Sequence, residues 1–350
     1  MKESLLNEVD TDDALREYLS RYYGKEISQT EDLEYQACCV DDTKTRYREI
    51  YKLIPKEVKS RNYGCGCSLP QDDLTGLTVL DLGSGAGLDA FLAARLVGET
   101  GRVIGVDMTD EQLAVARDHI QEVTEAYGYA SPNVEFHKGF IETADAVEDE
   151  SVDVVISDCT INLSPFKDRV FQTIHRVLKP GGEVHISDIV ADRRVPEQLM
   201  TDRKVVAECL GGALYEYDLF DTMEDVGFRD PRVVSRKLVE ENVLGHPIRF
   251  YSATVRAFKF SRELDRRCED YGQVAFYKGN CDEQPGTFIL DGGHAFEAGR
   301  PAAVCRNTAR MLTETRLSRY FEVTPERQHL GIFASCGTEV ASSDDVPSCC

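Results

Sequence analysis

Cysteines are the most reactive residues of this chain, which has twelve of them among 350 residues. Deprotonated thiols are strong nucleophiles and bind soft metals and metalloids. No two of them have the C-x-x-C spacing, which argues against zinc ribbons and thioredoxin-type redox sites. The spacing therefore calls for a different thiol chemistry. The cysteines are Cys38, Cys39, Cys65, Cys67, Cys159, Cys209, Cys268, Cys281, Cys305, Cys336, Cys349 and Cys350.

A second reactive pattern is the glycine-rich stretch at 79–87 (VLDLGSGAG). An apolar strand leads directly into glycines at alternate positions, which allow the backbone to approach a bound nucleotide closely. Asp107 follows at the end of the next strand, where its carboxylate can accept hydrogen bonds from ribose hydroxyls. The G-x-G-x-G spacing, with Asp81 two residues before the first glycine, favours S-adenosylmethionine over NAD. Asp81 also complements the ammonium and sulfonium charges of that cofactor.

Short apolar strands alternate with helical segments around these residues, which predicts a parallel, Rossmann-like, doubly wound α/β sheet with helices on both faces. Two later strands complete a seven-stranded sheet. The predicted strands are 78–83, 102–108, 134–139, 152–159, 183–189, 232–239 and 250–260. The predicted helices between them are 88–97, 111–127 and 166–178, the last of which is stopped by the residues 179–182 (KPGG).

Further helices are predicted outside this core. One follows Asp10–Asp12 and ends at Gly24, one runs from Pro196 through Cys209, and one runs to Val226 before a glycine. A C-terminal α+β module has predicted strands at 273–277 and 287–290 and a helix near 303–317. We therefore expect four parts: a cysteine-bearing cap or lid at 1–70, a methyltransferase domain at 71–260, a small α+β domain at 261–341, and a flexible tail at 342–350.

Cys159 ends the fourth predicted strand, and open α/β sheets bind ligands at the carboxyl ends of their strands. We therefore expect Cys159 to face the transferable methyl group. Several motifs in the order of one family accompany it, and through them the chain resembles arsenite methyltransferases. The motifs are 62–66 (NYGCG), 81–87 (DLGSGAG), 105–109 (GVDMT), 159–163 (CTINL) and 208–215 (ECLGGALY). The resemblance extends from about Cys38 to Phe260, and more loosely into the C-terminal module.

The resemblance implies that Cys65, Cys159 and Cys209 bind trivalent arsenic, with Cys39 as a fourth, redox-active thiol. Arsenite and methylarsenite would be the substrates, and a reductant of the thioredoxin or glutathione type would supply electrons. Ile141 and Glu142 resemble the pair that flanks adenine in such methyltransferases. The full set of residues expected to bind the cofactor is Asp81, Gly83, Ser84, Gly85, Asp107, Met108, Ile141, Glu142 and Cys159.

The residues leave several alternatives open. Cys38 adjoins Cys39, and Cys67 could take the place of Cys65. Four thiolates could instead form a structural zinc site, although tetrahedral zinc would leave no open face beside the methyl donor. Two other functions compete with arsenic methylation: methylation of an organic small molecule, and metalloid binding without catalysis.

The composition limits the partners. A formal net charge of −22 disfavours nucleic acids and anionic membranes, and no apolar run approaches the roughly 20 residues that span a bilayer. The N-terminus has neither the basic nor the apolar region of a signal peptide. These features lead us to expect a cytoplasmic protein that acts on a small molecule, and a monomer.

Overall fold

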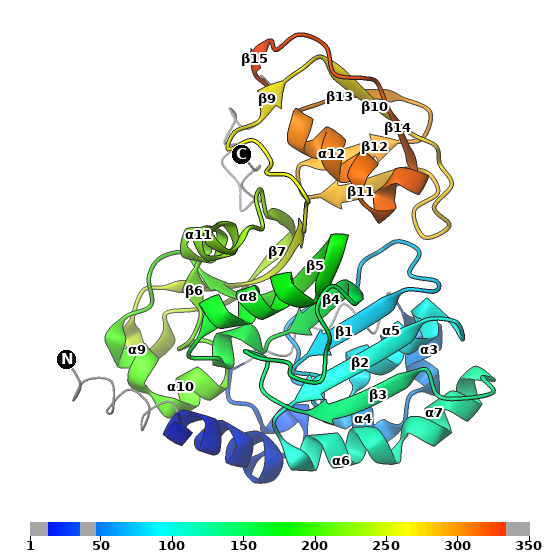
Figure 1. Ribbon diagram of the computed structural model, residues 1–350. Coiled ribbons are helices and arrows are strands. Elements are labelled where there is room, and N and C mark those ends of the chain that lie inside the picture. Colours follow the sequence, from blue (N-terminus) through cyan, green and yellow to red (C-terminus); the bar gives the residue numbers. More distant parts are fainter. Residues whose placement is uncertain (1–12, 36–46, 334–350) are drawn as a thin grey trace.

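The computed structural model describes residues 13–35 and 47–333, which form a twisted sheet covered by helices and a smaller C-terminal module (Figure 1). Five strands of the main sheet are parallel, in the order β3-β2-β1-β4-β5, and β8 and β7 continue the sheet in antiparallel pairings. The two-residue strand β6 pairs with the end of β5. The strands are β1 (Thr78–Leu82), β2 (Arg102–Asp107), β3 (Val134–Lys138), β4 (Val152–Asp158), β5 (Leu178–Ala191), β6 (Leu214–Tyr215), β7 (Arg232–Glu241) and β8 (Arg249–Phe258).

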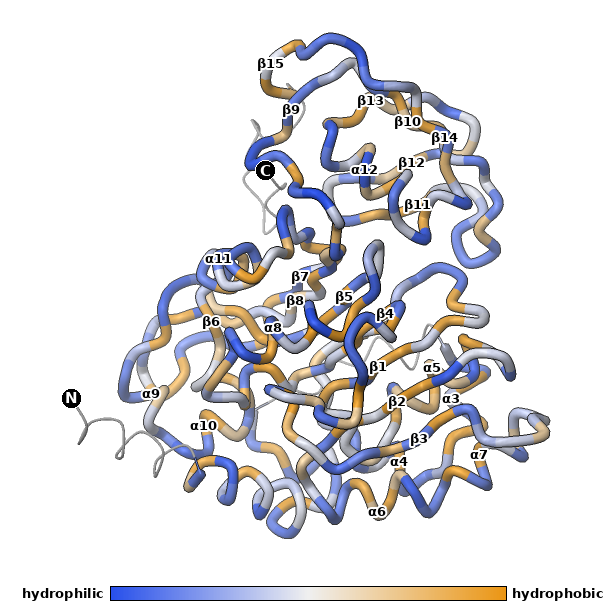
Figure 2. The backbone as a smooth tube through the Cα atoms, in the orientation of Figure 1, coloured by the Kyte–Doolittle hydropathy of each residue, from blue (hydrophilic) through white to orange (hydrophobic). Residues whose placement is uncertain are grey.

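Two hydrophobic layers hold the sheet, because neighbouring residues of each strand point to opposite faces. Val79 packs with the helices α5, α6 and α7 on one face, whereas Leu80 packs with α8 and α11 on the other. Figure 2 shows this hydrophobic character concentrated along the central strands. The helices are α3 (Arg48–Leu53), α4 (Lys56–Ser60), α5 (Leu88–Val97), α6 (Asp110–Asp118), α7 (Ile120–Tyr127), α8 (Lys167–Val177) and α11 (Glu216–Val226).

Three predicted helices that precede the C-terminal module differ from the structure. The segment 111–127 forms two helices, α6 and α7, which meet at His119. The segment that begins at Pro196 also divides, into α9 (Glu197–Thr201) and α10 (Arg203–Ala207), because the Asp202 side chain accepts hydrogen bonds from the first backbone N–H groups of α10. The N-terminal helix covers 13–21 and continues as the π-helical turn η1 (Tyr22–Glu26), so it does not end at Gly24. Its predicted capping residues, Asp10–Asp12, lie outside the described residues.

The predicted end of the helix before 179–182 is confirmed, since α8 ends at Val177, but the strand predicted to begin at Glu183 begins earlier, and 179–182 form the first part of the long strand β5. Gly181 has φ of +79°, and the pairing of β4 with β5 shifts register between Val152 and Val154. An irregular start therefore brings β5 into the sheet, and its later residues run beside β4 up to Asp158. The extended strand places Asp188 next to the end of β4.

The C-terminal module combines short antiparallel strand pairs with one helix, α12 (Arg306–Glu314), and the 3-10 helix η6 (Arg316–Arg319). The predicted strands at 273–277 and 287–290 are present, whereas the predicted helix near 303–317 is shorter. The strands are β9 (Glu269–Asp270), β10 (Gln273–Tyr277), β11 (Thr287–Asp291), β12 (His294–Glu297), β13 (Pro301–Val304), β14 (Phe321–Val323) and β15 (Gly331–Ile332). Shorter 3-10 turns elsewhere are η2 (Thr30–Asp32), η4 (Ile161–Leu163) and η5 (Val243–Gly245).

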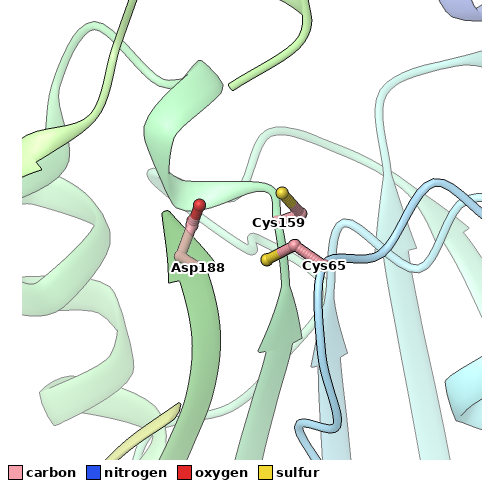
Figure 3. Close-up of side chains that lie close together, drawn as sticks. All are labelled: Cys65, Cys159 and Asp188. Atoms are coloured by element: carbon pink, nitrogen blue, oxygen red, sulfur yellow. The ribbon is translucent and has the colours of Figure 1, made fainter. Parts of the chain in front are cut away.

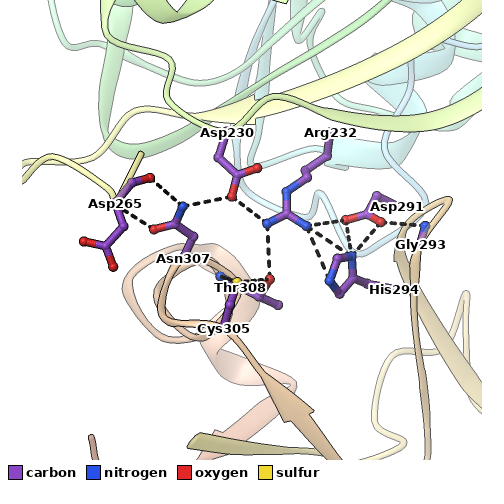
Figure 4. Close-up of polar contacts among 9 residues, drawn as sticks. All are labelled: Asp230, Arg232, Asp265, Asp291, Gly293, His294, Cys305, Asn307 and Thr308. Atoms are coloured by element: carbon purple, nitrogen blue, oxygen red, sulfur yellow. Dashed lines mark hydrogen bonds and ion pairs between the residues drawn. The ribbon is translucent and has the colours of Figure 1, made fainter. Parts of the chain in front are cut away.

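Buried charges join this module to the edge of the main sheet (Figure 4). Arg232 at the start of β7 is fully buried and forms ion pairs with Asp230 at 2.6 Å and with Asp291 at 3.3 Å. Its guanidinium also donates to the hydroxyl of Thr308 in α12 at 3.2 Å. Arg232 therefore joins the sheet to two elements of the module, β11 and α12.

Within the described ranges, the structure has no helix with the length and apolar character that a membrane span requires.

Candidate methyl-donor cleft and thiol site

A cleft of about 1020 Å³ lies at the carboxyl ends of β1, β2 and β4. All nine residues that the sequence suggested for cofactor binding line it, from Asp81 to Cys159. The structure therefore brings the predicted set together, and their contact with a cofactor stays a prediction.

The glycine turn after β1 forms one wall of this cleft. Gly83 has φ of +79°, and a Cβ atom added there would lie 2.2 Å from the Thr160 side chain. Only glycine therefore fits between β1 and the turn that follows β4. The backbone N–H of Gly85 donates to Asp107 Oδ2 at 2.9 Å, which ties the glycine turn to the end of β2.

Several carboxylates converge on the cleft. Burial raises the pKa of Asp81 well above its ordinary value, and the nearby charges of Asp89 and Asp107 raise it further. The pKa of Asp107 is raised by burial. Burial and the charge of Asp89 likewise raise the pKa of Asp158, which also lines the cleft. Among the described residues, Asp81 Oδ2 and Ser84 Oγ have no hydrogen-bond partner although both are buried. Such a pocket suits a cationic ligand with hydrogen-bond donors, as the ammonium and sulfonium groups of S-adenosylmethionine require.

The N-terminal helix covers the cleft. Arg16, Leu19 and Tyr23 line it from this side, and Arg16 Nη2 lies 3.2 Å from Glu142 Oε1. The guanidinium of Arg16 also stacks 4.6 Å from the centre of the Phe140 ring. The cap or lid expected at 1–70 stays a prediction.

Cys65, Cys159 and Asp188 meet beside the cleft, with their two sulfurs and a carboxylate oxygen within 4.8 Å of one another (Figure 3). All three are buried. Cys65 comes from the segment before β1, Cys159 follows β4, and Asp188 lies in β5. The backbone N–H of Cys65 donates to Asp158 Oδ1 at 2.9 Å, and that of Cys159 donates to the Ser187 carbonyl at 2.8 Å. Three separate elements therefore position the group.

Cys209 lies in the same buried cluster as Cys65 and Cys159 but is not a member of the close group. It follows α10, and its Sγ donates to the carbonyl oxygen of Cys159 at 3.0 Å. The thiol is therefore directed at the Cys159 backbone. Of the predicted arsenic ligands, the structure brings two into immediate contact range and places the third next to them.

Both Cys159 and Cys209 have left-handed backbone conformations, with φ of +54° and +67°. A side chain disfavours this region, and a non-glycine residue there costs roughly 1–3 kcal/mol. Glycine would suit both turns better. The presence of cysteine at each turn therefore points to a use for the thiol.

The other cysteines are separated from this site. Cys67 packs in a different core cluster, with Leu69 and α5, which favours Cys65 over Cys67 as the partner of Cys159. Cys268 is in a disulfide. Cys281 and Cys305 are buried thiols in the C-terminal module. The predicted redox thiol Cys39 and its neighbour Cys38 lie outside the described residues.

Asp188 and Asn162 are residues of the site that the sequence analysis missed. Asn162 Nδ2 donates to Asp188 Oδ1 at 2.7 Å and lies 3.5 Å from the carbonyl oxygen of Cys209. The available signal was position: Asp188 is near the carboxyl end of the strand beside Cys159, and Asn162 belongs to the CTINL motif. Neither residue type suggests thiol chemistry, so only the fold reveals their place.

A half-buried lysine contacts the turn that follows Cys159. Lys167 Nζ donates to the carbonyl oxygens of Asn162 at 3.2 Å and Ser164 at 2.9 Å. Burial lowers the pKa of Lys167, while the charges of Asp188 and Cys209 act in the opposite direction. The ammonium group therefore stabilises the turn after Cys159 and adds positive potential to the site.

Comparisons with known proteins agree with this geometry. Residues 73–238 match a family model described as a methyltransferase domain. An arsenite methyltransferase of Aquipseudomonas alcaligenes is 43% identical over 332 residues, which cover 92% of this chain and 95% of the relative. The human arsenite methyltransferase is 34% identical, with 93% of this chain and 88% of the relative covered.

Among solved structures, an arsenic(III) S-adenosylmethionine methyltransferase of Chlamydomonas reinhardtii superimposes with a TM-score of 0.78 at 42% identity. The match covers 82% of this chain and 98% of that one.

Proposed function

This chain belongs to the arsenite methyltransferase family, and we propose that it methylates trivalent arsenic held by the thiols of Cys65, Cys159 and Cys209. It is an S-adenosylmethionine-dependent enzyme whose substrate is a small arsenical. The observation that carries the ligand assignment is the position of Cys159. Its side chain is within 4.8 Å of the Cys65 sulfur, and it also lines the cleft of the methyl donor.

The chemistry of arsenic suits this arrangement. Trivalent arsenic is soft, prefers sulfur, and forms three bonds in a pyramid whose open face holds a lone pair. Cys65, Cys159 and Cys209 come from separate elements, so together they can direct that lone pair toward the cleft. Fixing a nucleophile in this way contributes up to about 7–11 kcal/mol to catalysis.

The residues of the cleft bind and orient the methyl donor. Bound S-adenosylmethionine supplies an activated methyl group. Asp81 and Ser84 provide acceptors for its cationic end, and Asp107 provides acceptors for the ribose hydroxyls. Ile141 and Glu142 line the same cleft where we place adenine, and Arg16 excludes water by covering it.

Electrons must accompany methyl transfer, because addition of a methyl cation to the lone pair converts arsenic(III) to arsenic(V). Two thiols oxidised to a disulfide return the two electrons, and an external dithiol then reduces that disulfide. We propose Cys39 for this role. The segment that precedes it is tied to the site, since the backbone N–H of Tyr35 donates at 2.7 Å to Glu208, the neighbour of Cys209.

The reductant that we propose is of the thioredoxin or glutathione type, which places the enzyme in the cytoplasm, where thiols are kept reduced. We propose that it works there as a monomer, because each expected function of the site is supplied by residues of one chain.

Cys159→Ser and Cys209→Ser test the ligand assignment. Purified protein is incubated with arsenite, S-adenosylmethionine and a thiol reductant, and methylated arsenicals are separated and quantified. Because serine is a hard, weak ligand for arsenic, we expect both variants to lose at least about a hundredfold in rate. Cys281→Ser is the matched control, since that buried thiol lies in the C-terminal module, and it should keep the parent rate. Parent rates in both site variants would exclude the assignment.

A further inference from the structure

Glu208, at the carboxyl end of α10, is fully buried and accepts hydrogen bonds from the N-terminal part of the chain. The hydroxyl of Tyr22 donates to Oε1 at 2.8 Å, and the backbone N–H groups of Glu34 and Tyr35 donate to the carboxylate at 3.1 Å and 2.7 Å. Burial of a charge is costly unless such donors compensate it. Packing alone would be served better by an apolar residue. The carboxylate therefore has a use, and its donors indicate what that use is.

The first donor belongs to the N-terminal helix, which covers the methyl-donor cleft. Arg16 and Leu19 of this helix line the cleft, and Leu19 and Tyr22 are buried together with Ala207 of α10. The neighbouring Tyr23, which also lines the cleft, donates its hydroxyl to the carbonyl oxygen of Ala207. Contacts at the end of α10 therefore hold a helix whose other side chains form one side of the cleft.

The other two donors fix the chain that follows this helix. They lie just after η2, and the side chain of Glu34 also forms an ion pair with Lys204 of α10. Figure 1 shows the N-terminal helix in dark blue beside α10. The carboxylate of Glu208 therefore binds both ends of the segment 22–35, and the helix can leave the cleft only when hydrogen bonds to a charged acceptor break.

We propose that Glu208 is a positioning residue that holds the N-terminal helix over the bound methyl donor and so determines how slowly the donor leaves the cleft. This inference rests on the part of the proposed function that places S-adenosylmethionine in this cleft. The donor leaves when the helix opens, as in many enzymes whose ligands are released by opening of a covering segment. Each hydrogen bond to the carboxylate lowers the population of the open form, because bonds to charged groups are strong.

Release kinetics separate this role from a purely structural one. Loss of the covering helix speeds release of the donor but does not slow its entry, because the open form binds it. A general loss of stability lowers the free energy of unfolding without a selective effect on release. The measurement needs no arsenic, so the thiols take no part in it.

The experiment measures the dissociation and association rate constants of S-adenosylmethionine by surface plasmon resonance on the full chain. Tyr22→Phe removes one donor and should raise the dissociation rate constant about tenfold or more, the effect of one hydrogen bond to a charged acceptor. Glu208→Gln should raise it at least as much, because a neutral amide with one acceptor oxygen replaces the carboxylate. In both variants the association rate constant should stay within about threefold of the parent value.

Tyr18→Phe is the matched control on the same helix. Its ring stacks on that of Tyr22 at a centroid distance of 6.0 Å, and this contact remains when the hydroxyl is removed, so neither rate constant should change. Tyr22→Phe in the Glu208→Gln chain should have a smaller effect than in the parent, since the bond is already weakened. Hydrogen exchange in Glu208→Gln should become faster at Glu34 and Tyr35 and stay at the parent rate in β1.

Parent dissociation rates in both Tyr22→Phe and Glu208→Gln would overturn the proposal. A lower free energy of unfolding with unchanged release would overturn it too, because Glu208 would then only support the fold. Asp107→Ala tests the placement of the donor separately. If that variant bound S-adenosylmethionine as tightly as the parent, the donor would lie elsewhere, whatever Glu208 does.

Discussion

Buried carboxylates at the methyl-donor cleft lower the stability of the ligand-free protein. Asp81 is the clearest case, because burial and the neighbouring acids raise its pKa and its Oδ2 has no hydrogen-bond partner among the described residues. A cation bound there relieves this unfavourable charge. Such a residue therefore lowers the stability of the ligand-free protein and raises its affinity for the cationic methyl donor.

Asp81→Asn removes the charge and keeps the shape. We expect the ligand-free variant to have a higher Tm than the parent at pH 8, because the buried negative charge is gone. Its affinity for S-adenosylmethionine should fall about tenfold or more, since the charge complement is lost. Thermal unfolding and calorimetric titration measure the two effects. Asp110→Asn, an exposed acid at the start of α6, should change neither property, and a lower Tm in Asp81→Asn would contradict this account.

The pH dependence follows from the same shift. A carboxyl whose folded pKa is raised takes up a proton more readily in the folded than in the unfolded protein. Stability of the ligand-free chain should therefore increase as the pH falls through the raised pKa of Asp81 toward its ordinary value. Affinity for the cationic donor should decrease over the same range, because the carboxylate is neutralised. Urea unfolding at a series of pH values should show a weaker pH dependence in Asp81→Asn than in the parent.

At the scale of elements, two turns carry the thiols, and they touch each other. Gly212, in the turn after α10, faces the carbonyl oxygen of Asn162, and a Cβ atom added at Gly212 would lie 2.0 Å from that oxygen. The turn with Cys209 can therefore approach the turn with Cys159 only because this position has no side chain.

Gly212→Ala should separate the two turns and lower the rate of arsenite methylation by about tenfold or more, because small displacements of reacting groups have large effects on rate. The affinity for S-adenosylmethionine should stay near that of the parent, since the glycine turn after β1 is not touched. Gly286→Ala is the control, because a Cβ atom there meets nothing within 4 Å. Steady-state kinetics with both variants checks this; an unchanged rate in Gly212→Ala would show that the contact does not matter.

The sequence predicts the regular elements well because they repeat a strong pattern. The glycine turn, Asp107 and Cys159 follow apolar strands directly, so their side of the sheet can be inferred. The division of 111–127 could not be inferred, since no glycine or proline marks it. The start of β5 at Leu178 could not be inferred either, because Pro180, Gly181 and Gly182 locally disfavour a strand. Asp188 was missed for a related reason: its neighbours come from segments far apart in the chain.

At the scale of the whole molecule, buried ion pairs join three parts of the chain. Arg316 of η6 lies 2.7 Å from Asp72, which precedes the sheet, and 2.6 Å from Glu183 in β5. Arg256 in β8 is 2.7 Å from the other oxygen of Glu183. These side chains are almost fully buried, so each depends on the others for its charge balance.

Arg316→Met should lower the free energy of unfolding by about 3–5 kcal/mol, because it leaves the buried carboxylates of Asp72 and Glu183 without this cation. Arg319→Ala is the matched control in the same turn. Its pair with Asp73 is about half exposed, so the loss should be below about 1 kcal/mol. Denaturant unfolding measures both values, and equal effects would show that burial of the pair is not what matters.

The left-handed backbone at Cys159 and Cys209 also limits how this chain can change over generations. A single nucleotide change converts a cysteine codon into a glycine codon, and glycine relaxes the strain at both turns. A lineage released from arsenic stress would therefore gain stability by losing its thiols first. Relatives that keep the fold but carry glycine at these two positions would therefore be identified as proteins no longer selected for arsenic methylation.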